Sequence, residues 1–199
     1  MIRAPHTAGG ALRRSRGAPR PVRRDDGERL FRTATLLAAM AMVVFAAGLR
    51  HRLPPGALGT AGCWAVGLSG LGAVADALLP LDCAPSVDAI CRRNEEHGNL
   101  SWPHQAHSWS SVLGAAALLA SLWLLGRHLR SAPGWRGVSV LGRVGFALLV
   151  TYSGVLTVMT AFYLPGVGLV QRIQELAFSA WLAVLALARR QSRGGCSRP

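Results

Sequence analysis

The sequence contains no lysine, few acidic residues and few aromatic residues, and each shortage narrows the class of protein. All 22 basic residues are arginine, against nine acidic residues, which gives a formal net charge of +13. Aromatic residues make up 7% of the chain, and none of the basic segments has the aromatic–basic motifs of nucleic-acid-binding modules. We therefore predict no nucleic-acid partner. The exclusive use of arginine is typical of GC-rich coding and indicates a bacterial gene.

The sequence also lacks the short motifs of well-known catalytic centres. It has neither the H-E-x-x-H pattern of zinc proteases nor the G-x-S-x-G pattern of serine hydrolases. Cys83 and Cys91 lack the C-x-x-C spacing of a metal site. No motif of this kind therefore assigns a reaction to the chain.

What the chain does contain is long apolar segments. Hydrophobic residues make up 51% of it and the mean hydropathy is +0.30. A helix needs about 20 mostly apolar residues to cross a bilayer, and a chain in lipid must satisfy its own backbone hydrogen bonds. We therefore predict an all-α fold, a polytopic transmembrane helical bundle with five spans. The spans are residues 33–49, 56–79, 105–126, 138–163 and 169–188.

Charge outside these spans predicts the domains and the orientation. Residues 1–32 hold nine arginines and predict a disordered tail, residues 33–188 form the bundle, and residues 189–199 form a basic C-terminal tail. The segment 82–101 is net acidic, whereas the other long loops are basic. The positive-inside rule then predicts a multi-pass protein of the bacterial inner membrane, with the acidic loop outside. The same rule conflicts with an N-terminal tail outside, which indicates either an exported tail or a missing first span.

Small and polar residues recur at helical spacing in four of the predicted spans, with Ser153, Thr157 and Thr160 in the fourth and Arg172, Glu175 and Ser179 in the fifth. Such faces let helices approach closely. The second span carries Gly62, Ala65, Ser69, Gly72 and Asp76 on one face, and the third carries His104, His107, Ser111 and Gly114.

Span parity places four helix ends in one leaflet, and most ionisable residues near the membrane lie there. Such groups usually face the bundle interior or a wet cavity. We predict that the cluster binds a lipid head group or small ligand, with membrane lipids as partners. The predicted contacts are Asp82, His104, His107 and Arg172, supported by Asp76 and Glu175, with Gln171 as a further candidate.

An enzymatic alternative stays open, a metal-assisted hydrolase or transferase acting on a lipid. His104 and His107, one turn apart, and Asp82 suit a zinc ion with an open position. Asp76 or Glu175 would then transfer protons. The structural alternative is that the imidazoles hydrogen-bond acids and hold the loop in place. No cofactor is firmly implied, and zinc is the one that the enzymatic alternative needs.

Cys83 and Cys91 share the acidic loop and are close enough in sequence to close a small disulfide ring. A disulfide forms only on the oxidising side of the membrane. The pair therefore agrees with an outward acidic loop.

Three short segments stand in a familiar order: 79–83 with the later Cys91, 101–107, and 168–172. Together they resemble the bacterial multi-pass membrane family catalogued as domain of unknown function 998. The resemblance covers about residues 30 to 190 and implies a small helical bundle, usually of six spans, and no reaction. This chain departs from the family pattern, because an arginine-rich tail stands where a first span is expected.

Overall fold

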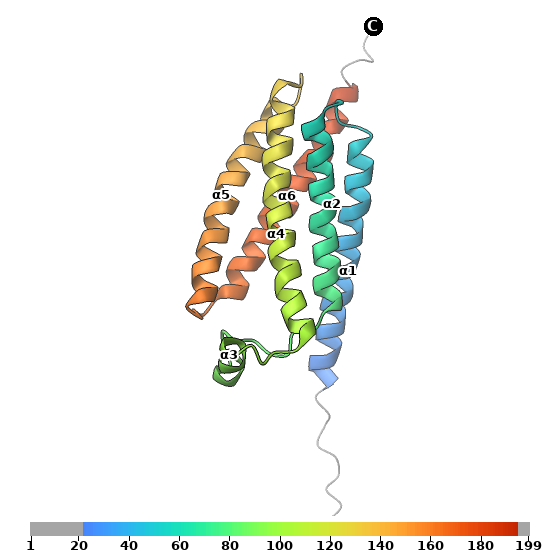
Figure 1. The fold of residues 1–199 in the computed structure, drawn as a ribbon. Helices are drawn as coiled ribbons and strands as arrows, with labels where there is room; N and C mark the ends of the chain where they lie inside the picture. Colours follow the sequence, from blue (N-terminus) through green and yellow to red (C-terminus); the bar gives the residue numbers. More distant parts are fainter. Residues whose placement is uncertain (1–21, 195–199) are drawn as a thin grey trace, which may run out of the picture.

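The structure, a computed structural model, describes residues 22–194, and this part of the chain consists of helices joined by turns and loops (Figure 1). The predicted all-α fold is confirmed. The long helices are α1 (Val22–Arg50), α2 (Ala57–Leu78), α4 (Trp102–His128), α5 (Arg136–Ala161) and α6 (Val167–Gly194). A short helix, α3 (Ala89–Glu96), lies between α2 and α4, and the 3₁₀ turn η1 (Leu129–Ser131) follows α4.

Four helices are long and apolar enough to cross a membrane: Arg29–Arg50, Ala57–Leu78, Trp102–Ser131 and Arg136–Ala161. They match the first four predicted spans in position. Helix α6 covers the fifth, but polar residues such as Arg172 and Glu175 in its first turns lower its hydropathy. The count of five spans therefore stays a prediction.

The first helix begins at Val22, inside the segment predicted as a tail. The rest of that predicted tail, residues 1–21, lies outside the described residues, as do residues 195–199. The C-terminal helix likewise continues to Gly194, into the segment predicted as the C-terminal tail.

Helix α2 is the centre of the bundle, and α5 is at its edge. Helix α2 packs against both α1 and α4, α4 also packs against α5, and α5 against α6. In the apolar 18-residue stretch of each helix, 44% of the α2 residues are buried but only 6% of the α5 residues. The core contains Val66, Leu122, Leu125, Trp181 and Leu185. The remaining apolar surface of the spans is available to lipid.

The two ends of the bundle are distinct (Figure 1). At one end, which we call the α3 end, α2 and α5 finish, α4 and α6 begin, and α3 lies across them. The grouping predicted from span parity is therefore confirmed. At the other end, α1 turns into α2 and α4 turns into α5. We call this the arginine end, for the residues described below.

Candidate functional site

The polar site is supported by a close contact between α2 and α4. A Cβ atom at Gly72 would lie 3.0 Å from the α-carbon of Gly114 and 3.1 Å from the carbonyl oxygen of Ser110. A Cβ atom at Gly62 would meet the side chain of Leu125. The two small-residue faces predicted from the sequence therefore meet. The backbones can approach this closely because glycine has no side chain.

Asp76 lies half-buried in this interface, near the end of α2. Its Oδ1 accepts a hydrogen bond from the Ser110 hydroxyl, and its Oδ2 accepts one from the Ser111 hydroxyl at 2.7 Å. Both serines belong to α4. The hydrogen bonds to Asp76 within the described residues thus come from two neutral hydroxyls of one neighbouring helix.

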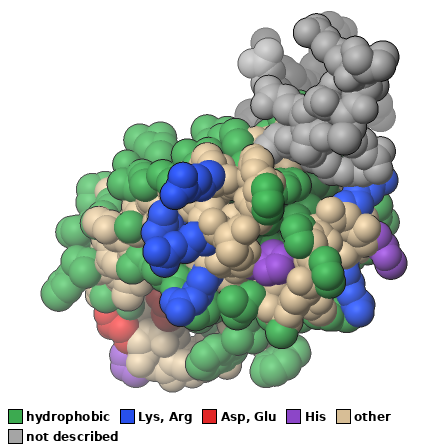
Figure 2. All heavy atoms as spheres, turned by 90° about the horizontal axis from the view of Figure 1, so that it is seen from above, with side chains coloured by type: hydrophobic (Ala, Val, Ile, Leu, Met, Phe, Trp, Pro, Cys, Tyr) green, Lys and Arg blue, Asp and Glu red, His purple; other side chains and the backbone are tan. Residues whose placement is uncertain are grey.

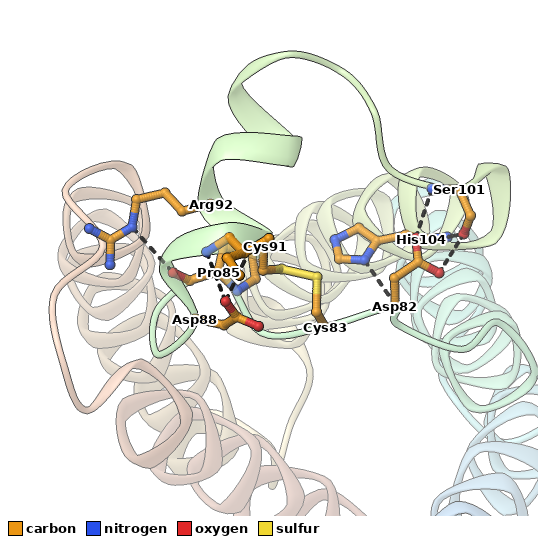
Figure 3. The surroundings of a disulfide bond; sticks show 9 residues. Asp82, Cys83, Pro85, Asp88, Cys91, Arg92, Ser101 and His104 are labelled. Atoms are coloured by element: carbon orange, nitrogen blue, oxygen red, sulfur yellow. Dashed lines mark hydrogen bonds between the residues drawn. A yellow bond between two sulfur atoms is a disulfide. The ribbon is translucent and has the colours of Figure 1, made fainter. Parts of the chain in front are cut away.

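Asp82 and His104 stabilise the chain where it leaves α2 and enters α4 (Figure 3). The Asp82 carboxylate accepts hydrogen bonds from the backbone N–H and the hydroxyl of Ser101, both at 2.7 Å. The Asp82 backbone N–H donates to Nδ1 of His104 at 3.1 Å, and His104 is only 3% exposed. The hydrogen bonds from Ser101 lower the pKa of Asp82, because they stabilise the ionised carboxylate.

His107 and Arg32 satisfy the last carbonyl groups of α2. Nδ1 of His107 lies 2.9 Å from the carbonyl oxygen of Leu79 and donates to it. Nε of Arg32, on α1, donates to the carbonyl oxygen of Ala77 at 3.1 Å. A cation here complements the helix C-terminus. Sequence analysis missed Arg32, because it was grouped with the arginine-rich tail.

The polar residues of α6 divide into a buried and an exposed group. Gln174 is 8% exposed and donates to the Ser153 hydroxyl of α5 at 2.9 Å. Sequence analysis also missed Gln174, because the resemblance to the family rested on the neighbouring segment that contains Gln171. Gln171, Arg172 and Glu175 are exposed. All three belong to the first turns of α6, which begins at the α3 end.

The four polar faces therefore form two pairs: α2 meets α4, and α5 meets α6. In α5, the hydroxyls of Thr157 and Thr160 bond carbonyl groups of their own helix. Helix α4 connects the two pairs, because it packs against both α2 and α5.

The loop that contains α3 connects the same two pairs from outside (Figure 3). Cys83 and Cys91 form a disulfide, with an S–S distance of 2.05 Å, as predicted. Asp88 caps α3 by accepting hydrogen bonds from the backbone N–H groups of Ile90 and Cys91. The guanidinium of Arg92 lies 4.5 Å from the ring centre of Tyr163, in the turn after α5.

Tyr163 has a left-handed backbone, with φ at 51°. The N–H of Leu164 donates to the carbonyl of Met159, and that of Tyr163 to the carbonyl of Thr160. This is the Schellman pattern, in which glycine usually takes the position of Tyr163. The ring of Tyr163 is thus held at the helix end, beside Arg92, despite a backbone that favours glycine.

The predicted zinc ligands are not arranged as a metal site. Within residues 22–194, no group of three or more His, Cys, Asp and Glu side chains is placed to hold a metal ion. Asp82 directs both carboxylate oxygens at Ser101, and His104 directs Nδ1 at the backbone. The assignment of Asp82, His104 and His107 as a ligand set stays a prediction, and the hydrogen bonds of Asp82 and His104 give it no support. Asp82 and His104 agree instead with the structural alternative, because their hydrogen bonds hold the loop in place.

Four helices of membrane-spanning length and composition define a helical membrane protein. The family model described as protein of unknown function (DUF998) matches residues 17–188, and the chain belongs to this family. The resemblance found from short motifs is thereby confirmed. No curated protein and no solved structure matches the chain.

Proposed function

We propose that the α3 end binds a zwitterionic head group, one with an ammonium and a phosphate, on a lipid or small ligand. The supporting observation is that Asp76 near the end of α2 and Glu175 in the first turns of α6 stand on helix segments that meet at the α3 end. Two carboxylates that share one region repel each other, and a bound cation removes that repulsion. An ammonium group would therefore bind between them.

The phosphate would bind Arg172, which lies one turn before Glu175 on the same helix and is exposed. Guanidinium groups recognise phosphates through paired hydrogen bonds. Nδ1 of His107 bonds the carbonyl of Leu79, so Nε2 of the same ring would supply a further polar contact to the ligand. Asp82 and His104, predicted as contacts, instead position the loop around the ligand. Gln171 stays a further candidate beside Arg172.

We place this end outside the bacterial inner membrane. The disulfide of Cys83 and Cys91 supports this orientation, since such a bond persists in an oxidising compartment. The arginines of the opposite end support it as well, since arginine-rich loops stay in the cytoplasm. The enzymatic alternative has no assembled ligand set in the described residues and receives no support from the geometry.

The test compares two short-chain lipids, dihexanoyl phosphatidylethanolamine and dihexanoyl phosphatidylglycerol, with the purified full chain in neutral detergent. Glu175→Gln keeps the shape of the side chain and removes its charge. We expect about tenfold weaker binding of phosphatidylethanolamine, because hydrogen bonds to charged groups contribute about 1.5–3 kcal/mol. Asp76→Asn should act similarly. Titration calorimetry measures the affinity.

The matched control is Glu95→Gln with Glu96→Gln, which removes two exposed acids of α3. The control should bind phosphatidylethanolamine as the unchanged protein does. Equal affinity of Glu175→Gln and the unchanged protein would show that the proposal is wrong. Glu175 is exposed and has no structural hydrogen bond, so this variant remains informative even if Asp76→Asn fails to fold.

A further inference from the structure

The arginine end carries a large excess of positive charge. Arg50 ends α1 and Arg52 follows it, and Arg127, Arg130, Arg136 and Arg143 belong to the α4–α5 hairpin; all six are exposed. The chain has no acidic residue between Glu28 and Asp76, and none between Glu96 and Glu175. Figure 2 looks onto this end and shows basic side chains gathered there, with acidic ones only at one edge. The charge is therefore unbalanced within the described chain.

These arginines are not used to hold the fold. Arg50 lies over the ring of Trp64 at 5.7 Å, and Arg127 over that of Trp123 at 5.4 Å. In the described residues, Arg130, Arg136 and Arg143 make no hydrogen bond or ion pair. The hairpin is held instead by uncharged contacts, such as the bond from the buried Ser139 hydroxyl to the carbonyl of Gly126 at 2.6 Å. The guanidinium groups thus remain available.

Arg143 fixes the level at which the partner must lie. It stands seven residues after the first residue of α5, which is about 10 Å along the helix. A Cβ atom at Gly126 would lie 3.5 Å from Cγ of Arg143, so Arg143 lies level with the end of α4. An exposed arginine at this depth is costly unless its guanidinium reaches the head-group layer. The Trp123 ring, exposed on α4, is typical of the same interface.

We propose that the four hairpin arginines, Arg127, Arg130, Arg136 and Arg143, form a binding surface for anionic phospholipid head groups. Arg143 stands about 10 Å inside the start of α5, so the anion that its guanidinium reaches would be a lipid phosphate of the head-group layer. Each arginine near a membrane surface strengthens anionic lipid binding about fivefold. This surface lies at the opposite end from the head-group site proposed above and is independent of it.

The experiment uses the purified full chain in neutral detergent, titrated with short-chain phosphatidylglycerol. We expect the change of all four hairpin arginines to glutamine to weaken binding by a hundredfold or more, at about fivefold for each arginine. Arg143→Gln alone should weaken it about fivefold. Arg93→Gln, an exposed residue at the α3 end, is the matched control for this single change and should bind as the unchanged protein does.

Several results would overturn this proposal. One is unchanged affinity for phosphatidylglycerol in both the fourfold variant and Arg143→Gln; another is an equal loss in the α3-end control. Duplex DNA and inorganic phosphate are titrated in parallel, and tighter binding of either one would assign the surface to that ligand instead. Glu175→Gln should retain phosphatidylglycerol binding, so the two proposals fail or succeed separately.

Discussion

The two ends of the bundle use the same helices but are stabilised by different chemistry. At the α3 end, side chains such as Asp76, Asp82 and His107 make hydrogen bonds between segments. At the arginine end, the contacts are apolar, place an arginine over a tryptophan ring, or bond backbone carbonyls, as His128 does with Pro54 at 3.0 Å. Charged side chains therefore make hydrogen bonds that hold the fold at the α3 end, whereas the arginines of the other end do not. Changes in charge should affect the stability of the first end and the lipid binding of the second.

Removal of the disulfide should produce the largest difference in stability between the two ends. Cys83→Ser with Cys91→Ser opens a ring whose ends are eight residues apart in sequence, and the chain-entropy estimate for such a ring is about 2–3 kcal/mol. Hydrogen exchange followed by mass spectrometry should show faster exchange in residues 83–100. Residues 127–136 at the arginine end serve as the control and should not change. Equal acceleration at both ends would contradict a local role for the bridge.

The second effect concerns how closely the backbone of α4 approaches α2 at Gly72 and α5 at Gly126. Alanine at Gly72 would place Cβ 3.0 Å from the backbone of α4, and overpacking of this kind costs about 1–3 kcal/mol. Alanine at Gly126 would meet its nearest atoms at 3.5 Å, an ordinary contact. We expect Gly72→Ala to lower the thermal midpoint by several degrees and Gly126→Ala to leave it nearly unchanged. The opposite order would show that the contact between α4 and α5 is the tighter one.

The smallest effect is a pH dependence confined to the α3 end. The pKa of Asp82 is lowered in the folded chain by its hydrogen bonds from Ser101. A lowered pKa stabilises the fold fully above the ordinary aspartate value of about 3.9, and the stabilisation is lost as the pH falls through the folded value. The loop at Ser101 should therefore loosen in acid. The fluorescence of Trp102, taken as the difference from Trp102→Phe, follows this change.

Asp82→Asn is the control for the acid response. It removes the titrating group, so the fluorescence of Trp102 should no longer change over the same pH range. The arginine end has no carboxylate among its described residues and should keep its protection from exchange. An acid transition that persists in Asp82→Asn would assign the response to another group.

Much of the fold was predictable because lipid restricts the chain so strongly. Apolar length located the first four spans, and helical spacing found the faces of α2 and α4 that meet at Gly72 and Gly114. Span parity then grouped the correct helix ends. These features follow from periodicity and from the hydrogen-bonding demands of the backbone, and both are local properties of the sequence.

The partners of individual side chains were less predictable. Arg32 resembles the other arginines of its segment, and only the position of α1 beside the end of α2 gives it a role. Whether His104 bonds a metal or a backbone N–H depends on the path of the loop after Leu79, which no spacing rule determines. Gln174 was missed for a similar reason, since its role depends on which face of α6 meets Ser153.

The left-handed turn at Tyr163 affects how its role must be measured. Glycine at this position would relieve the backbone but release the ring from Arg92, and these two changes have opposite signs. A melting curve of Tyr163→Gly could thus look ordinary while the α3 segment moved away from α5 and α6. Tyr163→Leu keeps the backbone requirement and removes the aromatic surface, so only this exchange isolates the link between the segment and the helices beneath it.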